Sequence, residues 1–208
     1  MREQREAEIH RLIGGDLCLD FANTLNGHVE PPSHEYLHDY RDLALWGRHT
    51  GILSSRSCKE LLDLAEARPV EAEDAFQKAI LLRETIFRIF SALALRHKPA
   101  EGDINQLNQV WRDAQRHTQL TPSSTGFVLG WDDEPALERF SRLIIASAIH
   151  LLTSENIRRI HQCAGDHCDW LFVDTSRNHL RRWCSMDECG NRAKMRRRQR
   201  RKKLASSK

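Results

Sequence analysis

The sequence predicts a mainly α-helical N-terminal domain with a small β element, followed by a small cysteine-containing module and a basic helix or tail. Three observations support this division. Apolar residues recur at helical spacing through most of the first 155 residues, four of the six cysteines fall within 27 residues near the C-terminus, and a run of arginines and lysines follows them. We expect the two domains to span residues 10–155 and 158–203.

Several segments of the N-terminal domain have the apolar periodicity of amphipathic helices. The clearest covers about residues 70–97, where the apolar stripe is broken only at Arg83 and Pro99 closes the segment. The same pattern predicts shorter helices from residue 36 to near Gly51, and over residues 54–67 and 104–114.

Three further segments complete this domain. Residues 17–26 begin with alternating apolar positions, which predicts a short strand running into a helix. Residues 121–130 combine turn residues with a short apolar run, which predicts a strand or hairpin. A last helix follows, which Asp132 or Asp133 would cap and which would hold Pro135 in its first turn. We expect its buried face to consist of Leu137, Phe140, Ile144, Ala148 and Leu151.

Composition excludes two classes of protein. Hydrophobic residues make up 40% of the chain, which is too many for a wholly disordered protein. The longest apolar stretch, residues 143–152, is about half the ~20 residues that a membrane span needs. The N-terminal segment also lacks the apolar core of a secretory signal. We therefore expect a cytoplasmic protein that does not span a membrane.

The small net charge of +3 hides an asymmetry between the two ends of the chain. Residues 158–208 contain 15 Lys/Arg against 5 Asp/Glu, whereas the first 157 residues contain 17 against 24. An acidic body that carries a strongly basic end indicates a polyanionic partner, and nucleic acid is favoured over a membrane surface.

The cysteine spacing indicates a metal site. Four residues separate Cys163 from Cys168 and Cys184 from Cys189, and 15 residues lie between the two pairs. Without a secretory signal, clustered cysteines more often hold a metal than form disulfides. Two thiolate pairs supply the four tetrahedral ligands of one structural zinc ion, which leaves no open position for catalysis. The alternative is a chance cluster of free thiols.

Nine of the twelve residues from Arg192 to Lys203 are lysine or arginine. A helix of this composition is positive on all sides, so we expect it to become ordered on a phosphate backbone. A solvated tail is the alternative, but the adjacent zinc module favours nucleic-acid binding. The predicted contacts are Arg177, Asn178, Arg181, Arg182, Asn191, Arg192, Lys194, Arg196, Arg197, Arg198, Arg200 and Arg201. Those suited to base edges are Asn178, Arg181, Asn191 and Arg192.

The N-terminal domain offers little chemistry. Asp20, Asn23 and Thr24 are polar residues among apolar neighbours, and they could line a small-molecule pocket. Capping a helix or satisfying buried backbone groups is the commoner role of these residue types. The sequence has no nucleophile elbow, phosphate-binding loop or dinucleotide fingerprint, so we expect no enzymatic activity.

The C-terminal residues resemble a known family. Cys189-Gly190-Asn191-Arg192 is the signature of the CGNR zinc finger, and three flanking segments are similar to it as well. These segments are Phe172-x-Asp174, Ser176-Arg177-Asn178 and residues 181–186. The resemblance implies zinc on Cys163, Cys168, Cys184 and Cys189, and DNA binding through the finger.

The N-terminal domain resembles the ABATE domain of bacterial stress-induced transcription regulators. The similarity rests on residues 17–21, on Asn23-Thr24 and on Trp46. Together the two resemblances imply a transcription regulator whose N-terminal domain senses a small-molecule effector or mediates dimerisation. The partners expected from this interpretation are duplex DNA, an effector and a second copy of the chain.

Three other functions fit the same features. Zinc modules with basic tails also bind RNA, the N-terminal domain could process a ligand while the finger tethers it, and a finger can bind another protein. Comparing affinity for duplex DNA and structured RNA at matched salt separates the first of these from DNA binding.

Overall fold

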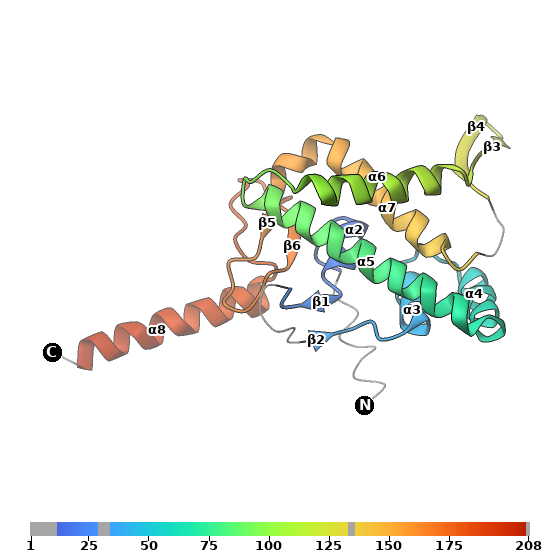
Figure 1. The fold of residues 1–208 in the computed structure, drawn as a ribbon. Helices are drawn as coiled ribbons and strands as arrows, with labels where there is room; N and C mark the ends of the chain where they lie inside the picture. Colours follow the sequence, from blue (N-terminus) through green and yellow to red (C-terminus); the bar gives the residue numbers. More distant parts are fainter. Residues whose placement is uncertain (1–11, 29–33, 133–135, 207–208) are drawn as a thin grey trace.

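The computed structural model describes residues 12–28, 34–132 and 136–206 (Figure 1). The helices are α2 (Leu17–Ala22), α3 (Tyr40–His49), α4 (Ser55–Ala67), α5 (Pro69–Ala94), α6 (Glu101–Gln115), α7 (Arg139–Thr153) and α8 (Asn191–Ser206). A 3₁₀ turn (Glu155–Arg159) and a π-helical turn (Met186–Gly190) follow α7 and precede α8. The predicted mainly α-helical fold is confirmed.

Short antiparallel strand pairs make up the β structure of the described residues. Strand β1 (Leu25–Asn26) pairs with β2 (His34–Glu35), β3 (Thr118–Ser123) pairs with β4 (Gly126–Trp131), and β5 (Ile160–Gln162) pairs with β6 (Leu171–Val173). The β3–β4 hairpin confirms the prediction for residues 121–130 and extends it to Thr118.

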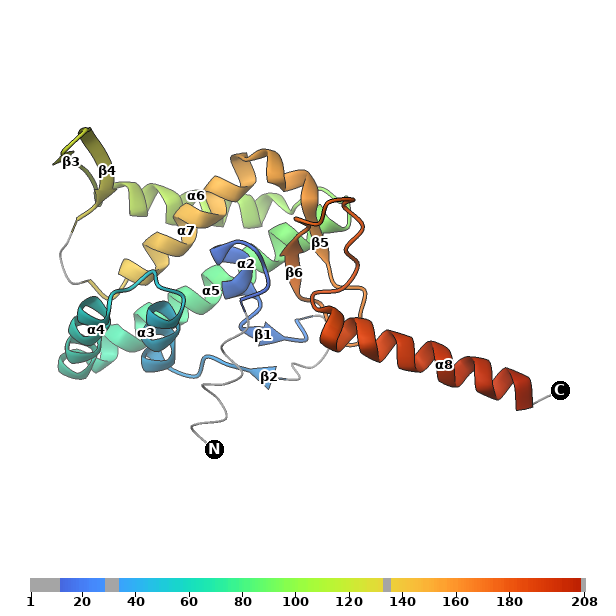
Figure 2. The same ribbon diagram turned by 180° about the vertical axis from the view of Figure 1, so that it is seen from behind.

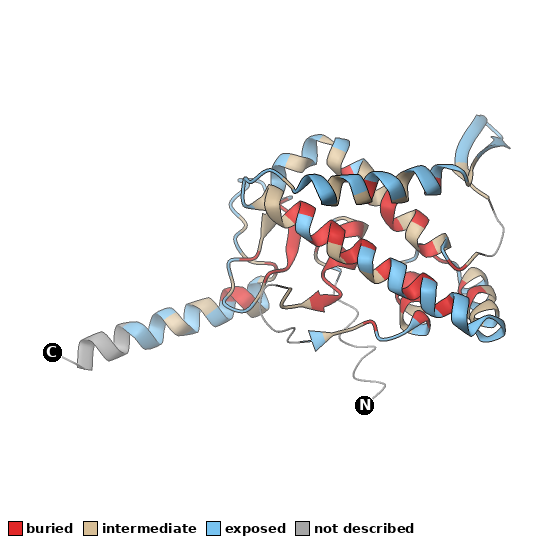
Figure 3. Cartoon of the chain, viewed as in Figure 1, coloured by how far each residue is buried: buried red, intermediate tan, exposed pale blue. Residues whose placement is uncertain are grey.

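Helix α5 forms the centre of the body, where α2, α3, α4, α6 and α7 contact it. Helix α2 contacts both α5 and α7, and the rings of Phe21, Trp46 and Phe140 meet there with centroids 5.2–5.7 Å apart. Figure 3 shows the buried residues on these facing helices, whereas α8 and the β3–β4 hairpin are largely exposed.

The longer helices lie close to where their periodicity predicts them. Ser54 caps α4 by accepting a hydrogen bond from the Ser57 backbone N–H at 3.0 Å, and Pro69 occupies the first position of α5. The helix predicted from residue 36 begins instead at Tyr40. Its start is fixed by Asp39, whose carboxylate accepts from the Asp42 backbone N–H.

The prediction for residues 17–26 has the elements in the wrong order. Residues 17–22 form the helix α2, which Asp16 caps, and the short strand β1 follows it. Helix α2 lies between two other helices, and residues 18–22 are all buried. Because no face of this segment is exposed, the alternation of apolar residues at its start does not indicate a strand.

The start of α7 also differs from the prediction. The helix begins at Arg139, and Asp132 does not cap it but accepts a hydrogen bond from Arg142 and pairs with His117. Asp133 and Pro135 lie outside the described residues. The predicted buried face is confirmed, with Leu137, Phe140, Ile144, Ala148 and Leu151 all buried.

Figures 1 and 2 show an elongated molecule with two projections. Helix α8 stretches away from the body at one end, beside the β5–β6 hairpin. The β3–β4 hairpin projects at the opposite end, beyond the C-terminal end of α6. The cysteine-containing module therefore joins the body to α8.

Candidate metal centre and basic helix

The four clustered cysteines come together at the base of α8. Cys163 follows β5 and Cys168 precedes β6, so both belong to the loop that joins these strands. Cys184 lies just before the π-helical turn, and Cys189 lies within it. The four sulfur atoms lie within 4.8 Å of one another.

The geometry fits a zinc ion. Ligands at about 2.3 Å from a tetrahedral zinc stand about 3.8 Å apart. The Cys184 Sγ lies 3.6 Å from the Sγ atoms of both Cys168 and Cys189, close to that spacing. Cys163, Cys184 and Cys189 are buried, which limits access of water to the centre.

Neighbouring groups support the sulfur atoms. The Cys184 backbone N–H donates to Cys163 Sγ at 3.2 Å, and Arg192 donates to Cys189 Sγ at 3.3 Å. Such donors stabilise thiolates and hold them in place. Gly165 is required in the first loop, because a Cβ there would stand only 2.9 Å from Cys189 Sγ.

The close approach of the sulfur atoms shifts the pKa values of neighbouring cysteines in opposite directions. Hydrogen bonds from Cys168 and Cys184 lower the pKa of Cys163, whereas the hydrogen bond to Cys163 raises the pKa of Cys184. Four thiolates this close together repel one another, and a dication bound between them supplies the charge that makes them stable.

The zinc module is anchored in the body rather than attached by a linker. Ile160, Leu171 and Val173 of β5 and β6 belong to the main buried cluster, and the two strands contact α5. The Val173 backbone N–H donates to Gly14 O at 2.8 Å. These contacts join the loop that carries Cys163 and Cys168 to the N-terminal domain.

Asn23 makes the most specific contact of this joint. Its side-chain Nδ2 donates to Leu171 O at 2.9 Å, and its Oδ1 accepts from the Leu171 backbone N–H at 2.8 Å. The buried side-chain amide of Asn23 thus donates to and accepts from the backbone of one β6 residue, as the backbone of a neighbouring strand does. Nearby, the Asp169 carboxylate accepts from the backbone N–H groups of Gly27 and His28.

Asp20 and Thr24, the other two polar residues of the predicted pocket, also bond to protein groups. Asp20 Oδ1 accepts from the Gly14 backbone N–H at 2.7 Å, and burial raises the pKa of Asp20 to about 6. The Thr24 hydroxyl donates to Phe21 O at 2.7 Å and accepts from Arg83. These contacts account for all three residues without a ligand.

Arg83 and Arg181 are anchors whose roles the sequence analysis missed. Arg83 is buried and forms a bidentate ion pair with Glu35, both N···O distances being 2.7 Å. The sequence could have indicated the role of Arg83, because this residue alone interrupts the apolar stripe of α5. It gives no such indication for Arg181, which lies in a segment that is basic throughout.

Arg181 is half-buried and held by several protein groups. Its guanidinium and Nε donate to the backbone oxygens of Ile13, Trp183 and Cys184, and it stacks 4.2 Å from the ring centroid of Phe172. The predicted role of Arg181 at a base edge would require it to leave these partners.

Asp174 organises the same segment. It accepts from the backbone N–H groups of Ser176 and Arg181 at 2.8 and 2.9 Å. Burial of Asp174 opposes its ionisation, but the hydrogen bonds from Ser176 and Arg181 outweigh burial and hold its pKa below the ordinary value. The charged carboxylate therefore fixes the loop between β6 and Cys184.

The other predicted nucleic-acid contacts divide by what they touch. Arg192 bonds Cys189, Arg196 pairs with Asp166 at 3.1 Å, and Asn191 Nδ2 donates to Asp187 O. Arg182 lies over the Trp183 ring. Arg182, Asn191 and Arg192 are exposed although they make these contacts. The remaining exposed ones, for which no such contact is described, are Arg177, Asn178, Lys194, Arg197, Arg198 and Arg200. The Arg201 side chain lies outside the described part of the structure.

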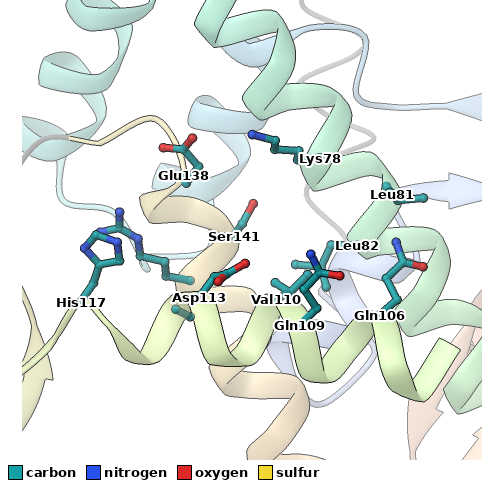
Figure 4. Close-up of a pocket in the computed structure, with 12 residues that line it drawn as sticks. Lys78, Leu81, Leu82, Gln106, Gln109, Val110, Asp113, His117, Glu138 and Ser141 are labelled. Carbon is teal, nitrogen blue, oxygen red and sulfur yellow. The ribbon is translucent and has the colours of Figure 1, made fainter. Parts of the chain in front are cut away.

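A cavity of about 620 Å³ lies between α5, α6 and α7 (Figure 4). Leu82, Val110 and Ala114 give it an apolar lining, and Lys78 and Glu138 lie above α6 on opposite sides of it. Further polar groups come from Gln106, Gln109, Asp113, His117, Ser141 and Arg142. The size and mixed lining are typical of small-molecule sites.

Comparison with known families gives two matches. Residues 15–155 match the ABATE family, described as "Putative stress-induced transcription regulator", and residues 159–202 match the CGNR zinc finger. No curated protein matched the chain. Among the described residues, no helix is both long and apolar enough to cross a membrane.

Proposed function

The chain belongs to the ABATE family and carries a CGNR zinc finger with one structural zinc ion, and from this premise we propose that it regulates transcription by binding duplex DNA. The two matched families are a regulator and a zinc finger rather than enzymes. Helix α8 is the observation that carries the proposal, because it joins the zinc centre directly and is strongly basic.

Helix α8 has the dimensions and charge of a groove-binding element. Its 16 residues give a length of about 24 Å, and the major groove of duplex DNA admits an α-helix. At 100° per residue, its basic positions from Arg192 to Arg200 are spread around most of the helix. Such a distribution suits a helix that has phosphates of both strands on either side.

The zinc centre would fix the direction of α8. Cys189 lies in the π-helical turn that leads into the helix, and Arg192 in the first turn of α8 donates to its sulfur. When bound, zinc supplies the charge that keeps the four thiolates in place. Without it, α8 would still be basic but would lose its fixed orientation relative to the body.

Duplex-DNA binding across a salt series, with and without a zinc chelator, tests this proposal. If six or more basic residues meet phosphates, the slope of log affinity against log salt is about −5 or steeper. Chelation should remove most of any sequence preference, because α8 then has no fixed orientation relative to the body. Tighter binding to structured RNA than to duplex DNA at matched salt would contradict the DNA assignment.

The cavity between α5, α6 and α7 favours an additional sensing role. It lies at the base of the β3–β4 hairpin, where Asp132 accepts from Arg142 at 3.2 Å and pairs with His117 at 2.8 Å. We infer that this cavity, rather than the surroundings of Asp20, Asn23 and Thr24, holds an effector. The three polar residues already have protein partners.

A thermal-shift screen of small polar compounds tests the sensing role. An effector should raise the melting temperature of the wild type. The same compound should have no effect on an Ala114→Phe variant, because the added ring fills the cavity beside Val110. A compound that stabilises both proteins equally would show that its site is elsewhere.

A further inference from the structure

The β3–β4 hairpin exposes large apolar side chains far from the zinc centre. It projects beyond α6, and Figure 3 shows it as largely exposed. The exposed fractions are 68% for Leu120, 73% for Phe127, 54% for Val128 and 67% for Leu129. Patches of this kind on a protein surface mark sites of interaction.

Most of these side chains share one face of the hairpin. Leu120 lies opposite Leu129, and Pro122 lies opposite Phe127 two positions along. Residues two apart on a strand point to the same side, so these four side chains form one apolar face. Trp131, at the base of the same face, packs partly against the main core.

This apolar face is also free of charge. Residues 118–131 contain no Asp, Glu, Lys or Arg, although charged residues make up 29% of the whole chain. The cores of protein interfaces are depleted of charge in the same way. Two identical copies of this face can therefore meet without placing like charges against each other.

We propose that the hairpin face is a homodimer interface, on which the hairpin of a second copy packs face to face about a two-fold axis. A two-stranded hairpin is marginally stable alone and needs a hydrophobic face covered. A twofold-symmetric dimer is the commonest assembly that covers two identical faces at once.

The available area fits a weak dimer. Each large apolar side chain hides on the order of 100 Å² when it is covered. Two copies of Leu120, Pro122, Phe127 and Leu129 then hide on the order of 800 Å². This apolar area is below the roughly 1,200 Å² at which specific, stable interfaces begin, so it fits a weak or transient association. The dimer should therefore depend on protein concentration.

The dimer has a consequence for the proposed DNA binding but does not rest on it. The hairpin and α8 lie at opposite ends of the body, as Figures 1 and 2 show. A dimer joined through the hairpins presents one basic helix at each distal end. The cavity between α5, α6 and α7 adjoins the hairpin base, so an occupant there would lie next to the interface.

Sedimentation equilibrium of the full zinc-loaded chain, without DNA, tests the proposal. Across the micromolar range the wild-type mass should rise from 24.1 kDa toward twice that value. A Phe127→Lys/Leu129→Lys variant should keep the mass of one chain, because the charges cannot be buried. A Leu95→Lys variant is the matched control. Leu95 is 54% exposed and lies before α6, away from the hairpin, so this variant should behave like the wild type.

A mixing experiment identifies which surfaces meet. Phe127→Lys/Leu129→Lys chains mixed with Phe127→Glu/Leu129→Glu chains should recover the double mass, because opposite charges then face each other across the two-fold axis. Absence of recovery would overturn the proposal. A wild type that stays at one chain throughout, or a dimer that survives the double lysine substitution, would also overturn it. The DNA-binding result does not affect any of these outcomes.

Discussion

Arginines of the zinc module and of α8 differ in whether the protein itself binds their guanidinium groups. Arg181 donates to three backbone oxygens and stacks on Phe172, whereas Arg197 and Arg198 are exposed on a helix that extends from the body. The same chemical group therefore stabilises the fold at one position and is available to a ligand at the other. Hydrogen-bond partners, and not the number of charges, separate the two roles.

The largest expected effect is the loss of stability on removal of the zinc ion, because zinc holds together the module that contains Arg181 and precedes α8. A Cys184→Ser variant should lose zinc and several kcal/mol of stability, because binding of structural zinc is itself folding free energy. Metal analysis and thermal unfolding measure both losses. A Cys58→Ser variant is the control, since Cys58 is a buried thiol of the N-terminal domain. Retention of stoichiometric zinc by the Cys184 variant would contradict the assignment.

Replacing Arg181 should affect stability more than DNA affinity. An Arg181→Ala variant leaves three backbone oxygens without their donor, and we expect a loss of about 3 kcal/mol in the free energy of unfolding. Arg181→Lys should recover little, because one ammonium cannot reproduce the planar fork. Urea unfolding measures the loss. A loss below about 0.5 kcal/mol would mean that Arg181 is not an anchor.

Asn23 tests the joint between the body and the zinc module. Asn23→Ala removes two buried hydrogen bonds to Leu171, and a cost of about 2 kcal/mol is expected. Hydrogen exchange should quicken at β6 before it quickens at α5, because the substitution loosens the joint and not the helical core. Uniform acceleration across both elements would argue against a local role for Asn23.

Asp20 gives stability a dependence on pH. Its folded pKa of about 6 lies above the unfolded value near 3.9, so the folded state binds the proton more tightly. Stability from this group is therefore greatest at low pH and declines by about 2 kcal/mol as pH rises from 4 to 7. Asp20→Asn should flatten this decline, as unfolding measured over the same pH range will show.

Much of the fold follows from the sequence because packing on one face leaves a clear helical period. Helices α4, α5 and α6 are amphipathic and lie where the period predicts them. Helix α2 is covered by α5 and α7, so its residues carry no period that identifies a helix. The start of α7 was misplaced since Asp132 instead binds Arg142 and His117 across the tertiary structure.

The metal centre was predictable for a different reason. Zinc ligands are set by residue type and spacing, and Cys163, Cys168, Cys184 and Cys189 show both. Roles that depend on distant partners have no local signal. The pairing of Asn23 with Leu171 joins residues 148 positions apart, and the anchoring of Arg181 by Ile13 joins residues 168 positions apart.

The central claim is that the zinc module orients α8 so that its exposed arginines contact DNA phosphates. The most direct test is the salt dependence of DNA binding by an Arg197→Ala/Arg198→Ala variant. The account predicts a slope shallower than that of the wild type by about 2, with an unchanged melting temperature. The affinity loss should be similar for all DNA sequences, as expected for residues that contact phosphates. An unchanged slope would contradict the account, because these exposed arginines would then not meet the DNA backbone.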